Sequence, residues 1–345
     1  MPNPESQSVS ERLIAQLEGE GEYTDEGSFS IDTLKGLDKL AQFQLADSRS
    51  YVLRLIEAGL IADADAIHVS VRPDHLEIAF ERADPIVLPA TVLDRLVTVL
   101  VGRVAEHPAI PRAMLVQLAV GVVAALHMSP SRLSIESVNA QGEGRRIWFE
   151  SATGQHSEAV HGGRPGTRVW VQGLGSQLHE RELIEAHCRW VRVPVIVDHR
   201  HVSQRALAVD PVVSAVVKFE GQVIGGAAFD SERGTGLLRL LSRGLLIATR
   251  HHPDFQPGLV ANVEVELRRD LSQAAFADED KIQAIVEVVK RIQDDELWHP
   301  DLPAQLATRL AQRQAKLQPP ASDGLVPLIL AIIALVLTSI IMNIS

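Results

Sequence analysis

Cysteine and aromatic residues are scarce in this chain of 345 residues. The single cysteine, Cys188, excludes an intramolecular disulfide and any zinc site built from cysteines alone, and it fits a reducing compartment. Aromatic residues make up 4% of the chain, so aliphatic side chains must form most of any core. With 46% hydrophobic residues, the length allows two ordinary domains that each bury a core.

Positive charge is also in short supply. The chain has 33 Lys and Arg against 44 Asp and Glu, a formal net charge of -11. Proteins that bind nucleic acids in general neutralise phosphates with clustered Lys and Arg, and no basic stripe of that kind is present. The sequence therefore predicts no nucleic-acid partner.

The first 27 residues are polar and acidic, without the apolar core of a secretory signal. We therefore expect residues 1–27 to be a disordered tail and the body of the protein to stay in the cytoplasm.

The sequence has one long apolar run, residues 325–342, "LVPLILAIIALVLTSIIM", which carries no charge. As a helix it would span about 27 Å, close to the thickness of a bilayer core. A buried helix of a globular core is the alternative, but such a helix would need apolar neighbours on every side. We expect a single-pass membrane helix that acts as a tail anchor, because only three residues follow, with residues 318–324 as its linker.

Hydrophobic periodicity outlines two folded units. In the first, we expect helices at 50–62, 89–102 and 111–127, and strands at 132–138, 145–150 and 167–172. The alternating segments "AIHVSV" and "HLEIAF" should pair as a hairpin. A helix beginning near Glu180 should open the second unit, with strands from 193 onward and an amphipathic helix at 278–292. The pattern predicts an α+β or mixed α/β fold.

Several segments resemble the heat-shock protein 90 family, the chaperone branch of the gyrase, chaperone, histidine-kinase and mismatch-repair ATPase superfamily. "FSIDTLKGLDKLAQFQ" and "VLRLIEAGLIADA" are similar to its first two helices, "LAVGVVAALHMSPSRLSIES" to its lid segment and core strand, and "GTRVWVQ" to the strand that closes its nucleotide pocket. "GLLIATRHHPDFQPGLVANVEVELRRDLSQAAF" is similar to part of its middle domain. The resemblance covers roughly residues 28–292. It implies a Bergerat-type ATPase-like sandwich at 28–178 and a chaperone-middle-like α/β domain at 179–317.

The same resemblance implies that the catalytic positions have changed. Arg54 and Ala58 take the places of the glutamate that orients water and of the asparagine that ligates magnesium. Arginine cannot act as a base near neutral pH, and the alanine side chain has no oxygen to bind a metal. A shift of one turn, which would use Glu57, puts Ile61 in the magnesium position and fails as well. The arginine that would reach the γ-phosphate corresponds to Gln273.

The remaining nucleotide motifs are only partly kept. Phe80 occupies the place of the aspartate that recognises adenine, and Arg82 and Asp84 occupy the places of two glycines. Three residues still match and would bind the cofactor if nucleotide binds: Gly121, Gly166 and Thr167.

Two further groups of residues suggest other chemistry. His199 and His201 could share a strand face and bind a metal, but no third ligand is evident and "DHRH" is typical of a solvated turn. His187 and Cys188 could suggest a thiol nucleophile with a histidine base. Sequence neighbours on a helix point about 100° apart, however, so Cys188 is interpreted as a buried packing residue. We expect neither a metal nor a catalytic cysteine.

Three hypotheses follow. The first is a tail-anchored, catalytically degenerate chaperone-like scaffold that binds a protein partner or client and needs no cofactor. The second is an ATP-binding chaperone with a divergent site, for which ATP and magnesium would be cofactors. The third is a membrane-tethered interaction protein whose likeness to the chaperones is coincidental. The family's C-terminal dimerisation domain has no counterpart here, so the sequence predicts no oligomeric state.

Overall fold

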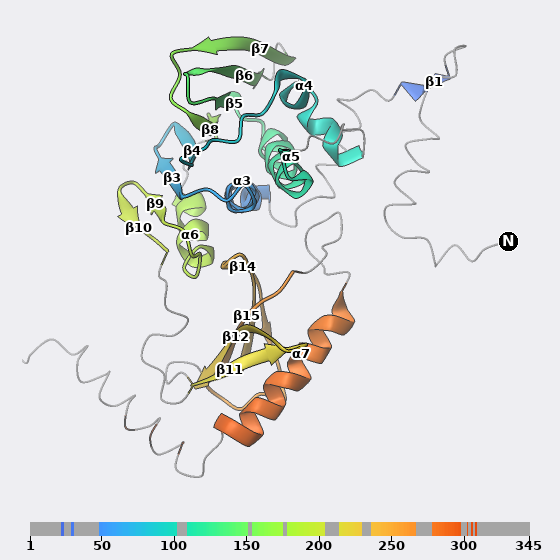
Figure 1. Cartoon of the computed structure of the whole chain (residues 1–345), viewed down its shortest axis with the longest axis vertical. Coiled ribbons are helices and arrows are strands. Elements are labelled where there is room, and N and C mark those ends of the chain that lie inside the picture. The colour runs from blue at the N-terminus through green and yellow to red at the C-terminus, as the bar shows by residue number, and fades with distance from the viewer. Residues whose placement is uncertain are drawn as a thin grey trace, which may run out of the picture.

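The computed structural model describes residues 22–23, 29–30, 48–101, 109–150, 154–174, 178–203, 214–229, 236–266 and 278–297, with single positions at 302, 305 and 308. The architecture is mixed α/β: an eight-stranded sheet with helices packed against it, and a five-stranded sheet covered by one long helix (Figure 1). A separate two-stranded pair consists of β1 (Glu22–Tyr23) and β2 (Phe29–Ser30). In the part of the chain that the structure describes, no helix is long and apolar enough to cross a membrane, and the segment 325–342 lies outside that part.

The eight-stranded sheet belongs to the first body and runs in the order β10-β9-β3-β4-β8-β5-β6-β7. Its strands are β3 (Ala66–Val71), β4 (His75–Glu81), β5 (Arg132–Val138), β6 (Glu143–Glu150), β7 (Gly154–His161), β8 (Gly166–Gln172), β9 (Val195–Val197) and β10 (Arg200–His201). The predicted hairpin is confirmed, because β3 and β4 pair antiparallel from Ala66 opposite Glu81 to Val71 opposite Leu76. Burial alternates along both strands, so one face of the sheet is apolar and the other is polar.

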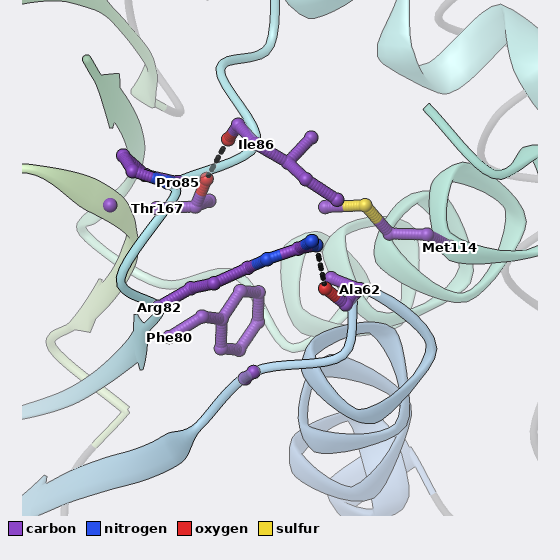
Figure 2. A pocket seen from close by; sticks show the side chains of 9 residues that line it. Ala62, Phe80, Arg82, Pro85, Ile86, Met114 and Thr167 are labelled. Carbon is purple, nitrogen blue, oxygen red and sulfur yellow. Dashed lines mark hydrogen bonds between the residues drawn. The ribbon is translucent and has the colours of Figure 1, made fainter. Parts of the chain in front are cut away.

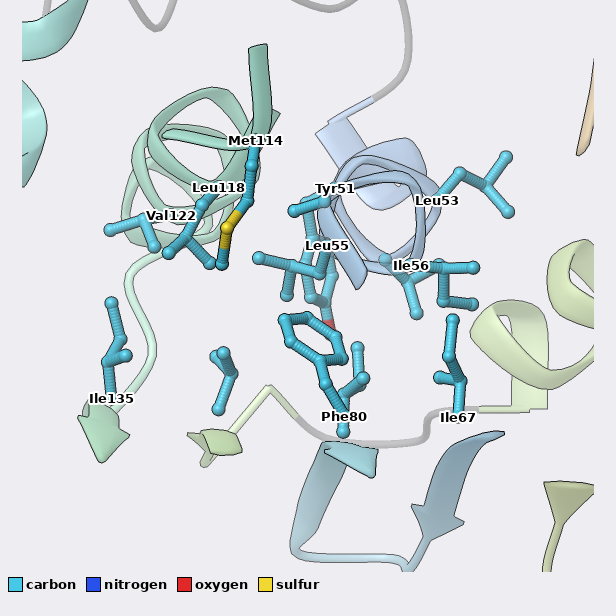
Figure 3. Packing of buried hydrophobic residues seen from close by; sticks show 14 of the residues in the cluster. Tyr51, Leu53, Leu55, Ile56, Ile67, Phe80, Met114, Leu118, Val122 and Ile135 are labelled. Atoms are coloured by element: carbon cyan, nitrogen blue, oxygen red, sulfur yellow. The ribbon is translucent and has the colours of Figure 1, made fainter. Parts of the chain in front are cut away.

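Two helices, α3 (Tyr51–Ile61) and α5 (Arg112–His127), lie side by side on the apolar face. Leu55, Phe80 and Leu118 meet in the core between them and the sheet (Figure 3). Instead of one helix at 89–102, the chain forms the short helix α4 (Ala90–Leu93) and a 3-10 helix at Leu96–Val101. The β-branched residues of this stretch lose side-chain freedom in a helix, which disfavours a long one.

The first body extends further along the chain than expected. Helix α6 (Leu178–His187) packs against α3, and β9 pairs in parallel with β3, Ile67 lying opposite Val195. The sequence predicts a second domain from residue 179, whereas in the structure β9 and α6 pair and pack with elements of the first body. A three-residue apolar strand gives no sequence signal of the strand with which it pairs.

The second body is a five-stranded sheet in the order β11-β12-β15-β13-β14, covered by helix α7 (Glu279–Ile292) (Figure 1). Its strands are β11 (Ser214–Phe219), β12 (Gln222–Phe229), β13 (Leu237–Ser242), β14 (Leu245–His251) and β15 (Leu259–Glu264). The amphipathic pattern of α7 is confirmed, because Ile282, Ile285 and Val289 are buried against the sheet. A π-helical turn at Gln293–Leu297 continues the helix.

The turn between β13 and β14 joins the two bodies. Gly244 has a φ of +80°, and a Cβ added there would lie 2.4 Å from the backbone oxygen of Trp190. Leu245 is buried within the core of the first body. The backbone oxygen of Leu246 accepts a hydrogen bond from Nδ1 of His187 at 2.6 Å. The turn is therefore closely fitted against α6 and the loop that follows it.

Candidate functional site

The candidate site is the region of the first body where the resemblance would place a nucleotide. Helix α3 supplies Arg54 and Ala58, and the strands β4 and β8 supply Phe80, Gly166 and Thr167. Phe80 lies directly opposite Thr167 in the β4–β8 pairing. The topology thus brings the strand residues to one point beneath the end of α3.

Phe80 fills the space between the sheet and α3. A Cβ added at Gly59 would lie 2.7 Å from Cδ1 of the Phe80 ring, so the ring packs directly on the helix backbone. Ala58, the residue before Gly59, is fully buried. An apolar ring offers no acceptor to an exocyclic amine, and a buried donor left without one costs about 1–3 kcal/mol.

The hydroxyl of Thr167 is already hydrogen-bonded within the protein. Its Oγ1 lies 3.2 Å from the Oγ of Ser137 and 3.5 Å from the backbone oxygen of Ile86. The Ser137 hydroxyl in turn accepts a hydrogen bond from the Leu88 backbone N–H at 2.8 Å. Gly166 beside it has a φ of +112°, and a Cβ there would lie 2.7 Å from the Phe80 backbone oxygen. This glycine is explained by the close approach of β8 to β4.

Arg82 closes the site from the side. Its guanidinium donates a hydrogen bond of 2.7 Å to the backbone oxygen of Ala62, at the C-terminal end of α3 (Figure 2). A cation is favourable at that end of a helix dipole. The cavity that remains has a volume of about 10 Å³ and is lined by Ala62, Ala64, Phe80, Arg82, Pro85, Ile86, Met114, Gly166 and Thr167. Such a volume holds about one water molecule, whereas ligand pockets measure roughly 300–1,000 Å³.

Gly121 lies away from this cavity, in the contact between α3 and α5. A Cβ added there would lie 2.7 Å from Cδ2 of Leu55 and 3.1 Å from the backbone oxygen of Tyr51. The glycine therefore allows two helices to approach closely, which is a packing role.

Arg54 also faces elsewhere. It forms an ion pair of 2.7 Å with Glu57, and the two side chains are only 7% and 4% exposed. Burial raises the pKa of Glu57, and the charge and hydrogen bond of Arg54 oppose this rise. The hydroxyl of Ser242, from the turn that joins the bodies, also bonds to Glu57. The pair belongs to the junction between the two bodies.

Of the residues expected at a nucleotide site, the structure thus brings Gly166 and Thr167 to one cavity with Phe80 and Arg82. It places Gly121, Arg54 and Ala58 in the core or at the junction, and Gln273 lies outside the described residues. Met114, from α5, lines the cavity but was not singled out in the sequence. Met114 is an apolar residue on a helix, and the sequence pattern at such a position indicates only that the side chain packs in the core.

The other candidates have no catalytic surroundings. Cys188 is fully buried, and burial raises the pKa of its thiol, which makes a thiolate nucleophile unfavourable. His199 lies in the β9–β10 turn and His201 on β10. Among the described residues there is no group of three or more His, Cys, Asp or Glu side chains that could hold a metal ion.

Comparison with known proteins adds no identity: no model of a known family matches the chain, and no curated protein is similar to it.

Proposed function

We propose that the chain is a catalytically degenerate, chaperone-like scaffold that binds a protein partner at the cytoplasmic face of a membrane. In this proposal the first body is a Bergerat-type sandwich related to the heat-shock protein 90 family, the second is a chaperone-middle-like domain, and residues 325–342 are the anchor. The observation that best supports the loss of ATPase activity is the small volume of this cavity, about 10 Å³. A nucleotide would have to displace Phe80 and break the Arg82 hydrogen bond before it could enter.

The binding of a partner is supported by the polar face of the eight-stranded sheet. Trp148 stacks on His156 with ring centroids 5.3 Å apart, and Arg132 lies 5.0 Å over the Trp148 ring. Arg146 lies 5.9 Å from the centroid of Trp170 on the same face. Trp and Arg side chains dominate the energetics of protein interfaces. They are a weaker match to nucleic acid, given the net charge of -11.

Titration of the full-length protein in detergent with ATP and magnesium tests the first part of the proposal. We expect no heat of binding that corresponds to a dissociation constant below about 1 mM, and no release of phosphate. Binding that is tighter than this, and that is weakened by Thr167→Val but not by Thr249→Val on β14, would overturn it. That result would favour the second hypothesis, a nucleotide-binding chaperone in which Gly166 and Thr167 contact the ligand.

A further inference from the structure

A second, larger cavity lies on the opposite face of the eight-stranded sheet. Its volume is about 210 Å³. Its floor is a row across four paired strands, in which Ile196, His68, Ala79 and Arg168 lie opposite one another in turn. Ala79 and Ser70 are the small residues at the centre of the floor, and the larger side chains around them form the walls. The cavity therefore exists because small side chains at its centre are surrounded by larger ones on the neighbouring strands.

The walls carry balanced charge. Arg72, Arg164 and Arg168 line the cavity together with Glu77, Glu81 and Asp198. A ligand with charges of one sign would gain attraction from half of this wall and repulsion from the other half. The balance favours a ligand that carries both signs.

Two of the carboxylates are already engaged. Glu81 lies 2.8 Å from Nε2 of His68 and 3.7 Å from Arg164. Asp198 accepts a hydrogen bond of 3.0 Å from the Val71 backbone N–H and pairs with Arg181. The contacts of Asp198 hold the β9–β10 turn against the end of β3 and against α6.

Arg168 is a rigid cation at the floor. It is 7% exposed and donates to the backbone oxygen of Arg164 at 2.7 Å and to Glu136 at 3.4 Å. Burial and the nearby Arg164 guanidinium both lower its pKa. Its donors are thus used by protein groups, and Arg168 shapes the floor of the cavity.

Three charged or polar side chains at the cavity can still form hydrogen bonds or ion pairs with a ligand. Within the described residues, the side chains of Arg72 and His199 have no hydrogen-bond or ion-pair partner, and the nearest cation to Glu77 is Arg168 at 3.9 Å. Arg72 and His199 are donors, whereas Glu77 is an acceptor. Arg72 and Glu77 lie diagonally across the β3–β4 hairpin, since Ser70 is opposite Glu77. A cation and an anion are thus presented side by side to the same hollow.

His199 occupies a strained backbone position at the edge of this cavity. Asp198 and His199 have φ angles of +45° and +69°, which makes the β9–β10 connection a two-residue turn of the type that favours glycine at its second position. A histidine is disfavoured there, and such strain persists where the surroundings enforce it. The imidazole is carried to the cavity in spite of that cost.

We propose that this cavity binds a small zwitterion that carries a carboxylate and an ammonium group, a free α-amino acid. The carboxylate lies against Arg72 and His199, and the ammonium group lies against Glu77. The volume is below that of pockets for drug-sized molecules, which fits a ligand of this size. The site lies on the same polar sheet face as the aromatic residues proposed to bind a partner, since Trp170 lies opposite Glu77. Its test is separate from that of the proposed function, because it measures the binding of an amino acid and not of a partner or of ATP.

The test uses the purified full-length protein in detergent and its thermal unfolding midpoint. Each proteinogenic L-amino acid is added singly at millimolar concentration, with succinate and putrescine as dianionic and dicationic comparators. At least one amino acid should raise the midpoint, whereas the comparators should not. The dissociation constant of the best ligand is then measured by calorimetry.

Arg72→Gln and Glu77→Gln should each weaken that ligand at least tenfold. Arg291→Gln on α7 and Glu143→Gln on β6 remove matched exposed charges elsewhere and should leave its affinity unchanged. His199→Gly should weaken binding and at the same time raise the unfolding midpoint of the free protein, because it relieves the strained turn. The proposal is wrong if no amino acid shifts the midpoint, if a comparator does so equally, or if Arg72→Gln and Glu77→Gln bind as well as the parent protein.

Discussion

At the scale of single residues, the Arg54–Glu57 pair shows how one position can change its role. Each side chain is almost fully buried, and the pair contacts a hydroxyl of the second body through Ser242. A buried ion pair adds little net stability, but removal of one partner leaves a charge without compensation. The pair is therefore best understood as a contact that specifies how the junction packs.

Arg54→Met should destabilise the protein by about 3 kcal/mol at neutral pH, because Glu57 stays buried without its cation. The pKa of Glu57 is already raised in the folded state by burial, and the substitution raises it further. A carboxyl whose pKa is raised on folding gives stability that is complete below its unfolded pKa and is lost as the pH increases through its folded pKa. The variant should therefore approach the parent protein as the pH falls toward about 4, measured by urea unfolding across pH.

The double variant Arg54→Met/Glu57→Leu is the matched control, because it removes both charges together. It should be about as stable as the parent protein at neutral pH, without the pH dependence of the single variant. If the single variant has the same pH profile as the double variant, Glu57 is not the group that titrates.

At the scale of elements, two turns of the second body contain a glycine with a positive φ. Comparing them distinguishes the effect of backbone conformation from the effect of packing. Gly244 in the β13–β14 turn and Gly221 in the β11–β12 turn have nearly equal φ angles, +80° and +79°. A Cβ at Gly221 would meet no atom within 4 Å, whereas one at Gly244 would lie 2.4 Å from the Trp190 backbone oxygen. The difference between them is the contact with the first body.

Gly221→Ala should cost about 1–2 kcal/mol, the cost of a left-handed conformation for alanine. Gly244→Ala should cost roughly 1–3 kcal/mol more, because the backbone of Trp190 must also move. Hydrogen exchange should quicken in α6 and β14 for Gly244→Ala alone. Equal protection of α6 in the two variants would show that this turn does not hold the bodies together.

The comparison of elements also shows what the sequence can predict. The β3–β4 hairpin and α7 were predicted because alternation and a period of 3.6 residues each specify one buried face. Strand β7 was missed, since its sequence, "GQHSEAVH", is polar and mostly exposed at the edge of the sheet. At the candidate site, the resemblance to the chaperone family pointed to Gly166 and Thr167, but the packing of Phe80 and Arg82 beside them depends on contacts between α3, β4 and β8. Contacts of that kind are tertiary, and no local pattern encodes them.

At the scale of the whole molecule, the two bodies are joined by direct contacts as well as by the chain. Arg243 lies 3.3 Å from Asp63, and Arg192 lies 2.8 Å from Glu264, both at exposed positions where ion pairs contribute little. The buried contacts of the β13–β14 turn are expected to contribute more. They include the packing of Gly244 and Leu245 and the hydrogen bond between His187 and Leu246. A partner that binds the polar sheet face would contact the first body only. The second body would remain attached through its contacts with the first.

Membrane attachment is the remaining prediction at this scale, and it depends on residues 325–342. Removal of residues 325–345 should move the protein from the membrane pellet to the soluble fraction after alkaline extraction, because an uncharged and predominantly apolar segment of eighteen residues is long enough to span a bilayer. Ala334→Arg, near the middle of the segment, should reduce insertion, since a central arginine costs about 2.5–3.5 kcal/mol. Ser322→Arg, in the linker, adds the same charge outside the segment and should leave the protein in the pellet. Retention of the truncated chain in the pellet would instead indicate that the two folded bodies themselves bind the membrane or a protein in it.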